Sequence, residues 1–298
     1  MEKDVKVKII KRLLTFFVGL PAVIALVLFL PFYRHLPLNI VVILFSAIGA
    51  VEFSQMLEKK NLYISKVQAF ILGALPPAML TLMTSFNFQD WTIPLLLMAG
   101  GSWVLLSGVF YRLEKMETAA NHIAAGFSVM FYPGFFMYWL VKMSVWDNSG
   151  AILVFLLITF GNDSAAWLFG NLFGANNRGI IPASPNKSIA GFIGGIFGCI
   201  VVSCGAALIF PEIFIMRTDD SFLPVVPSFL IGKAVILGVC TGIAATLGDL
   251  AESAIKRSCQ VKDSGSLMFG RGGVLDSIDS IAVAAPVFFL LFHLFFVI

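Results

Sequence analysis

The chain has 298 residues, of which 59% are hydrophobic and only 12% are charged. Since soluble domains have roughly 45–50% apolar residues, this composition excludes an ordinary water-soluble globular protein. The apolar residues occur in runs of about 18 or more, the length with which a helix crosses a hydrocarbon core of about 30 Å. The sequence therefore predicts an all-α, polytopic integral membrane protein.

Nine membrane spans are expected in chain order, with ends that carry a margin of about 2–4 residues. Proline and glycine inside several of them do not reduce this number, because both are frequent in membrane helices. The first span is kept as structure and not as a signal peptide, because no convincing small-residue cleavage site follows it. The expected spans are 13–33, 38–56, 67–85, 91–111, 120–142, 150–173, 188–210, 227–255 and 278–298.

Lysine and arginine residues predict the orientation of the chain, because basic residues in short loops are retained on the cytoplasmic side. They cluster before the first span and after the second, fourth, sixth and eighth spans, whereas the other loops hold few. We therefore expect a cytoplasmic N-terminus and a location in the inner, cytoplasmic membrane. Because this bias accounts for most of the net charge of +3, and no DNA-binding motif is visible, nucleic acid is not an expected partner. The clustered residues are Lys3, Lys6, Lys8, Lys11, Arg12, Lys59, Lys60, Lys66, Arg112, Lys115, Arg178, Lys187, Lys256, Arg257, Lys262 and Arg271.

The polar residues divide the chain into an N-terminal half, residues 1–145, and a C-terminal half, residues 146–298. Spans of the first half carry almost no ionisable residue near their centres, so we expect membrane scaffold helices there. Glu52 and His122 are exceptions, but both lie near predicted cytoplasmic ends, which favours snorkelling or local pairing over catalysis. We expect the chemistry to lie in the C-terminal half, at the cytoplasmic face.

Two aspartates, Asp163 and Asp249, lie inside apolar spans of the C-terminal half. Because an ionised carboxylate in hydrocarbon is costly, such a group usually faces a cavity, a metal or a cation. The alternative is a structural carboxylate paired with a neighbouring lysine. Helical spacing places Asp249 on one face with Glu252, Ser253 and Lys256. One wall of the eighth span is therefore charged.

Two cytoplasmic connections add groups suited to binding phosphate. Glycines in the connection after the eighth span allow close backbone approach to a ligand, and amides at the start of the ninth helix could meet an anion. Carboxylates for a divalent metal, basic groups and glycines are the parts that phosphoryl or nucleotidyl transfer needs. The residues concerned are Lys262, Asp263, Arg271, Gly272, Gly273, Asp276 and Asp279 after the eighth span, and Arg178, Ser184, Lys187 and Ser188 after the sixth.

The segment 253–280, SAIKRSCQVKDSGSLMFGRGGVLDSIDS, carries a family resemblance. It resembles the signature of the phosphatidate cytidylyltransferases, S-x-x-K-R-x-x-x-x-K-D followed by G-x-G-G-x-x-D-x-x-D. Upstream, the segments GNDSAAWLFGNLFG and ASPNKSIAGFIGG resemble a second conserved region of that family in order and distance. The resemblance covers roughly residues 160–285, and the first five spans match only in being apolar.

The resemblance implies an enzyme that makes CDP-diacylglycerol and pyrophosphate from CTP and phosphatidic acid, with Mg²⁺ and room for a second cation. It also implies a polytopic, all-helical homodimer in the lipid bilayer, whose metal-binding aspartates match Asp249 and Asp276. The catalytic positions that match the motifs are Lys187, Lys256, Arg257, Lys262 and Asp263. The expected substrate-binding positions are Asn162, Asp163, Ser184, Ser188, Ser253, Arg271, Gly272 and Gly273.

The chain departs from the family pattern at four positions. Where the family usually has a basic residue, a glutamate, a histidine and an arginine, this chain has Asn171, Ala190, Arg271 and Ser277. Other functions therefore stay open: a CTP-dependent enzyme on another lipid phosphate or a polyprenol, or an inactive scaffold. A cation-coupled transporter could use the two intramembrane aspartates, but it predicts a repeat symmetry that the dissimilar halves lack.

Overall fold

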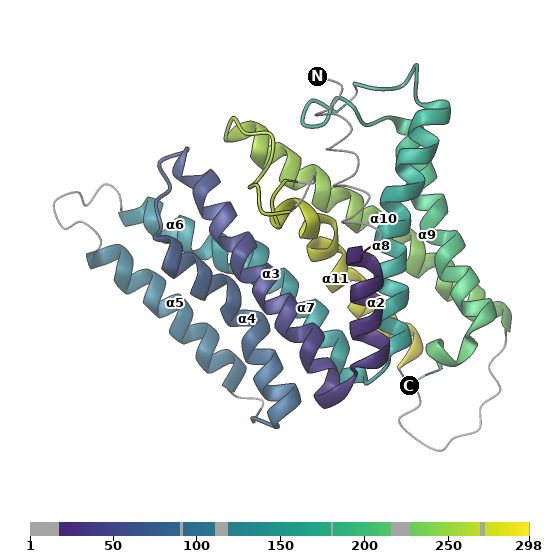
Figure 1. Cartoon of the computed structure of the whole chain (residues 1–298), viewed down its shortest axis with the longest axis horizontal. Helices are drawn as coiled ribbons and strands as arrows, with labels where there is room; N and C mark the ends of the chain where they lie inside the picture. Colours follow the sequence, from purple (N-terminus) through teal and green to yellow (C-terminus); the bar gives the residue numbers. More distant parts are fainter. Residues whose placement is uncertain are drawn as a thin grey trace. The chain divides into compact units, whose positions relative to one another are not determined.

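The computed structural model of the chain describes residues 18–89, 92–110, 119–179, 181–215, 227–268 and 272–297. Within these ranges the chain forms helices and no β-strand, which confirms the predicted all-α fold (Figure 1). The elements are α2 (Leu20–Phe29), α3 (Phe32–Glu58), α4 (Lys66–Phe86), α5 (Thr92–Phe110), α6 (Ala119–Val129), the π-helix η3 (Met130–Phe135), α7 (Phe136–Met143), η4 (Ser144–Trp146), α8 (Ser149–Phe173), α9 (Ile189–Ile209), η5 (Pro211–Phe214), α10 (Pro227–Ser258) and α11 (Leu275–Phe296).

Eight helical segments of the described residues are long and apolar enough to cross a membrane. They match the second to ninth expected spans and confirm a polytopic membrane protein. The first expected span, residues 13–33, is described only from residue 18 onward, and α2 within it is a shorter apolar helix of 10 residues. Of the charged loop residues used above, Lys3, Lys6, Lys8, Lys11, Arg12, Arg112, Lys115 and Arg271 lie outside the described residues.

Contacts within the chain define two compact units. The first comprises residues 1–147 and 255–278, and the second comprises residues 148–254 and 279–298. Both α10 and α11 therefore contribute to both units, and most of the signature segment, residues 255–278, groups with the N-terminal helices. The expected division of roles between residues 1–145 and 146–298 stays a prediction.

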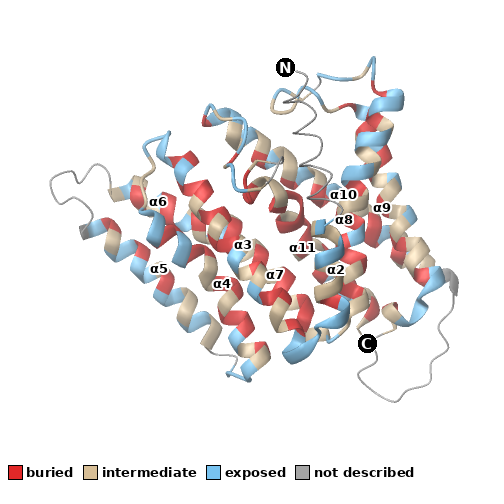
Figure 2. Ribbon diagram, in the orientation of Figure 1, coloured by how far each residue is buried: buried red, intermediate tan, exposed pale blue. Residues whose placement is uncertain are grey.

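In the first unit, α3 and α4 pack closely through small residues. A Cβ atom on Gly73 of α4 would come within 2.3 Å of the Ala50 Cβ of α3. The Ser46 hydroxyl lies 2.7 Å from the carbonyl oxygen of Gly73 and 2.8 Å from that of Pro133. Pro133 lies in η3, whose wider π-helical turn accommodates a residue without an N–H. Both α3 and α4 have buried residues where they pack and exposed residues elsewhere (Figure 2).

In the second unit, α8 and α9 pack through glycines of α9. A Cβ atom on Gly194 would come within 2.3 Å of the Phe169 side chain, and one on Gly195 would come within 2.6 Å of the Asn162 side-chain oxygen. Other apolar residues of α9, such as Phe197, are exposed. Figure 2 shows exposed stretches along this helix. Exposed apolar residues on a membrane helix suit contact with lipid tails, whereas small residues let helix backbones approach each other.

Helix ends that the charge pattern assigns to the same side of the membrane lie together in the first unit. Lys59 and Lys60, after α3, line a cavity of about 350 Å³ with residues 258–260, at the end of α10. At the opposite end of α3, the Asn39 side-chain amide donates a hydrogen bond of 3.3 Å to the Ser144 hydroxyl after α7. The first pair of ends is expected inside the cell and the second pair outside.

The second unit shows the same grouping. The Asn148 side-chain amide donates to the carbonyl oxygen of Ile213 at 3.0 Å, and both residues lie in connections expected outside. Near the same side, the Lys233 ammonium donates to the carbonyl oxygen of Phe295 at 2.6 Å. Within each unit, the helix ends are therefore grouped as an alternating topology requires.

Candidate active site

A cavity of about 380 Å³ lies in the second unit, where α8, the beginning of α9 and α10 meet. This volume falls in the range of small-ligand sites. The cavity is lined by five residues that the sequence predicted, Asn162, Asp163, Lys187, Ser188 and Asp249. Arg178, which the sequence placed among the groups suited to binding phosphate, also lines it, together with three polar residues that the predicted site did not include, Asn171, Asn186 and Thr246.

The connection between α8 and α9 forms the rim of this cavity. Ser188 is the N-cap of α9, and its hydroxyl oxygen accepts a hydrogen bond from the Gly191 N–H at 3.0 Å. The Arg178 guanidinium donates to the carbonyl oxygen of Gly170 at 3.0 Å and lies 3.4 Å from the Asn171 side-chain oxygen. These bonds tie the connection to the last turns of α8, so its basic residues are held at the rim.

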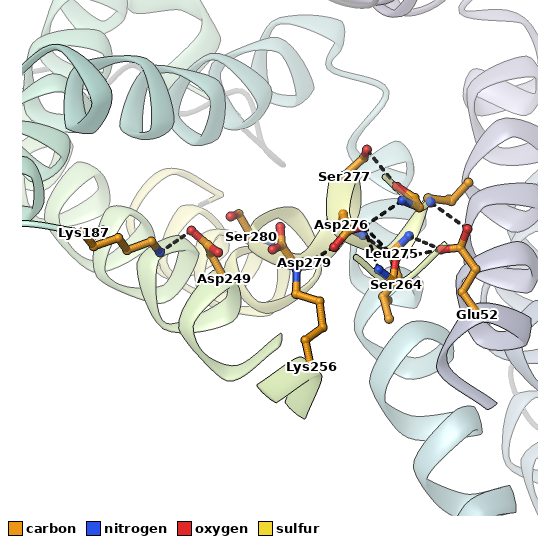
Figure 3. A network of polar contacts seen from close by, with 12 residues as sticks. Glu52, Lys187, Asp249, Lys256, Ser264, Leu275, Asp276, Ser277, Asp279 and Ser280 are labelled. Atoms are coloured by element: carbon orange, nitrogen blue, oxygen red, sulfur yellow. Dashed lines mark hydrogen bonds and ion pairs between the residues drawn. The ribbon is translucent and has the colours of Figure 1, made fainter. Parts of the chain in front are cut away.

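Lys187 and Asp249 form an ion pair inside the cavity (Figure 3). The lysine comes from the α8–α9 connection and the aspartate from α10, and both side chains are partly buried. The sequence left open that Asp249 is a structural carboxylate paired with a lysine, and the structure shows such a pair. The same carboxylate also faces the cavity, so the pairing and a role in binding a ligand are compatible.

Asn162 and Asp163 take different positions although they are neighbours on α8. Asn162 is buried, and its side-chain amide donates a hydrogen bond of 3.3 Å to the Thr246 hydroxyl of α10. The Cys199 sulfur of α9 lies 3.6 Å from the Asn162 side-chain oxygen, so this asparagine joins three helices. Asp163 is exposed, and both residues line the cavity.

In the first unit, Asp276 is held by donors from three directions (Figure 3). Its Oδ2 accepts hydrogen bonds from the Ser264 N–H at 2.9 Å and from the Gly273 N–H at 2.7 Å. Its Oδ1 pairs with the Lys256 ammonium at 2.5 Å. Charge-assisted bonds of this kind are strong and favour the ionised carboxylate. Asp276, at the beginning of α11, is therefore held in place by Lys256 and by the loop that precedes this helix.

The paired glycines of the signature make room for this carboxylate. Gly272 has φ of +108°, and a Cβ atom there would come within 2.4 Å of Asp276 Oδ2. A Cβ atom on Gly273 would come within 2.1 Å of the Ser264 hydroxyl oxygen. Both positions thus require glycine for the fold of the loop. Their expected contact with substrate stays a prediction.

The remaining predicted residues are more scattered. The first unit contains Arg257, Lys262 and Asp263, and all three are exposed. The second unit contains Ser184, in the α8–α9 connection, and Ser253, on α10, and both are half-buried. Arg271 lies outside the described residues, so its expected substrate contact stays a prediction.

Glu52 is the residue that the sequence interpretation missed. It is 6% exposed and accepts hydrogen bonds from the backbone N–H groups of Val274 and Leu275 at 3.0 and 2.9 Å. The expectation of snorkelling or local pairing is therefore wrong, because its partners lie more than 200 residues further along the chain. The available signal was an acidic residue in an otherwise apolar span.

The donors around the cavity suit Mg²⁺ in their chemistry. Asp163, Asp249 and Asn162 offer hard oxygen atoms, the ligands that Mg²⁺ prefers. Among the described residues, no group of three or more His, Cys, Asp or Glu is arranged to hold a metal ion. Mg²⁺ usually keeps several waters and takes one or two carboxylates together with substrate phosphates, so a dedicated protein cage is not required.

Comparisons with known proteins extend the similarity over the whole chain. A sequence model of the cytidylyltransferase family matches residues 10–295. The chain is 34% identical to a Haemophilus influenzae protein named phosphatidate cytidylyltransferase, over 96% of this chain and 98% of the relative. It is 29% identical to a Bacillus subtilis protein of the same name, over 90% of this chain and 93% of the relative.

Another relative, the Escherichia coli "Uncharacterized protein YnbB", is 36% identical over 51% of this chain and 46% of its own length. The match of the family model to residues 10–295 corrects the expectation that the N-terminal half resembles the family only in being apolar. Glu52 gives a physical reason, because an N-terminal helix contributes to the loop that carries Asp276. The chain belongs to the cytidylyltransferase family.

Proposed function

We propose that the chain transfers the cytidylyl group of CTP to phosphatidic acid, giving CDP-diacylglycerol and pyrophosphate. The observation that carries this proposal is the match, over nearly the full length of both chains, to a relative named phosphatidate cytidylyltransferase. Family membership favours this nucleotidyltransferase over the cation-coupled transporter. The sequence of the apolar N-terminal half does not identify the lipid substrate. Another lipid phosphate or a polyprenol is therefore the alternative acceptor.

In the proposed reaction, a phosphate oxygen of phosphatidic acid attacks the α-phosphorus of CTP, and the bond to the β-phosphate oxygen breaks as pyrophosphate leaves. Both reactants are anions, so their approach requires positive charge. Lys187 and Arg178 supply it at the cavity of the second unit. Lys256, Arg257 and Lys262 are the corresponding groups of the first unit.

We propose Asp249 and Asp276 as ligands of Mg²⁺. Bound Mg²⁺ would neutralise phosphate charge and polarise the phosphorus that is attacked. Each of these carboxylates is engaged by a lysine, Lys187 or Lys256, that we expect to contact phosphate. Exchange of partners would turn the lysines toward phosphate when the carboxylates bind metal. A second cation stays a prediction.

For the location, we propose the inner membrane of a bacterial cell, with a cytoplasmic N-terminus and a cavity that opens to cytoplasmic CTP. The grouping of helix ends within each unit supports the alternation of the spans, and the loop charges support the cytoplasmic N-terminus. At the cavity rim, Arg178 beside Asn171 supplies a cation next to the position where the family usually has a basic residue. A homodimer is implied by the resemblance and stays a prediction.

The test is the release of pyrophosphate from CTP by the full chain in detergent with Mg²⁺, with and without phosphatidic acid. We expect lipid-dependent release that Asp249→Asn and Asp276→Asn each reduce by about a hundredfold or more, because a metal ligand is lost. Glu58→Gln, on an exposed carboxylate at the end of α3, is the matched control and should retain activity. No release with phosphatidic acid or another lipid phosphate would refute the assignment.

A further inference from the structure

The carboxylate of Glu52 reaches from α3 to the loop that precedes α11 (Figure 3). Its Oε1 accepts a hydrogen bond from the Val274 N–H at 3.0 Å, and its Oε2 accepts one from the Leu275 N–H at 2.9 Å. The Ser264 hydroxyl lies 3.0 Å from the same Oε2. Because Glu52 is only 6% exposed, protein groups and not water solvate this charge.

These two amides lie at the beginning of α11, where backbone N–H groups have no acceptor within the helix. A helix N-terminus also carries partial positive charge, which a carboxylate stabilises. Glu52 therefore caps α11 from a different helix. A capping residue normally lies beside the helix it caps, but this one precedes Val274 by 222 residues.

The loop is shaped to receive the Glu52 side chain. A Cβ atom on Gly265 would come within 2.3 Å of Glu52 Oε1, and the next two nearest atoms, at 2.7 and 3.1 Å, also belong to Glu52. A Cβ atom on Gly273 would come within 2.3 Å of Glu52 Oε2. The glycines at both positions thus create the space that the carboxylate fills.

Ser264 connects this anchor to Asp276. Its hydroxyl lies 3.0 Å from an oxygen of each carboxylate, and its N–H donates to Asp276 Oδ2 at 2.9 Å. The Leu275 amide, bound by Glu52, immediately precedes Asp276 in the chain. Glu52 can therefore fix the orientation of Asp276 through two routes, the serine and the first turn of α11.

We propose that Glu52 is a positioning residue, which holds Ser264, Val274 and Leu275 so that the Asp276 carboxylate keeps the orientation needed to bind Mg²⁺. The role assigned to Asp276 rests on the proposed function, whereas the anchoring of the loop by Glu52 does not. Two measurements therefore test the two roles separately. Amide hydrogen exchange reports on the anchoring of the loop, and the Mg²⁺ requirement of pyrophosphate release reports on metal binding.

The first experiment compares Glu52→Gln with Glu58→Gln, an exposed residue of the same helix, in the full chain. A glutamine keeps one acceptor oxygen but turns an NH₂ group toward an amide donor. We expect hydrogen exchange of the Val274 and Leu275 amides to rise about tenfold in Glu52→Gln, the effect of losing one such hydrogen bond. The Mg²⁺ concentration for half-maximal pyrophosphate release should rise by about fivefold or more, with melting temperature and KM for CTP close to those of the control.

The second experiment is a double-mutant cycle between Gly265→Ala and Glu52→Ala. In the native background, the added methyl group meets Glu52, so Gly265→Ala should raise amide exchange and the Mg²⁺ requirement by about tenfold. In the Glu52→Ala background the obstructing atoms are gone, so the same change should have an effect of about twofold or less. Should Glu52→Ala fail to fold, Glu52→Asp, whose carboxylate is one methylene shorter, takes its place.

The outcomes discriminate. If Glu52→Gln leaves amide exchange and Mg²⁺ requirement like those of Glu58→Gln, or if Gly265→Ala has equal effects in both backgrounds, the positioning role is wrong. If exchange rises but the Mg²⁺ requirement does not, the loop is anchored and the link to metal binding is wrong. Absence of activity in the unmodified chain would refute the proposed function and leave the exchange result intact.

Discussion

Lys187 and Asp249 hold each other in the cavity of the second unit, with side-chain exposures of 26% and 32%. Each is proposed to bind a ligand group of opposite charge, phosphate for the lysine and Mg²⁺ for the aspartate. A nucleotide that arrives with its metal offers both groups a new partner at the same time. Before the substrate binds, each residue of the pair thus neutralises the charge of the other.

At Lys187 we predict that substitution by methionine lowers kcat/KM for CTP by about 10- to 150-fold, the loss expected for one hydrogen bond to a charged group. Steady-state kinetics of pyrophosphate release measures this effect. Lys66→Met, at an exposed lysine at the beginning of α4, is the control and should change kcat/KM by about twofold or less. Equal kinetics for the two variants would show that Lys187 has no contact with substrate.

The sequence could identify residues whose neighbours in the chain share their role. Asp276, Lys256 and the paired glycines lie within one signature, and the structure joins Asp276 to Lys256 and to the Gly273 amide. Glu52 could not be assigned in this way, because nothing near it in the sequence binds it. Its donors, the Val274 and Leu275 amides, come close to it only in the folded chain.

At the scale of helices, α8 and α9 depend on the absence of side chains at their contact. A Cβ atom on Gly198 would come within 2.6 Å of the Ala165 Cβ, whereas a Cβ atom on Gly205 of the same helix would meet nothing within 4 Å. These two glycines therefore offer a matched comparison of packing against intrinsic helix propensity.

We predict that Gly198→Ala destabilises the protein by about 1–3 kcal/mol through overpacking. Gly205→Ala should be neutral or stabilising by about 0.4–1 kcal/mol, because alanine restricts the unfolded chain without meeting a neighbour. Unfolding in mixed micelles, followed by tryptophan fluorescence, measures both. If Gly198→Ala is as stable as Gly205→Ala, then α8 and α9 are not in tight contact there.

The positions of the spans could be predicted because hydrocarbon demands long apolar helices, and length and composition are properties of the sequence itself. Local departures from regular helix could not. Three consecutive residues, Tyr33, Arg34 and His35, have positive φ within the range of α3, and a π-helical turn interrupts the span that contains Pro133. Proline signals such a departure but does not determine its form.

For the whole molecule, orientation in the membrane follows from loop charge and can be tested with single cysteines. In a chain whose native cysteines are replaced by alanine, we predict that an impermeant maleimide added to intact cells labels Phe88→Cys and not Lys60→Cys. Both positions are exposed in the structure. Lys60→Cys should react only after permeabilisation, because the loop charge predicts that its loop is cytoplasmic. The reverse labelling pattern would invert the proposed topology.

The distance along the chain between Glu52 and its donors has a consequence for biogenesis. At ribosomal elongation rates, Val274 emerges roughly 10–45 s after Glu52, since 222 residues separate them. Throughout that interval the second span is in the membrane with a carboxylate that lacks its eventual donors. Until α11 arrives, this carboxylate has to stay near water or headgroups, so a helix that is synthesised much later completes the seating of α3.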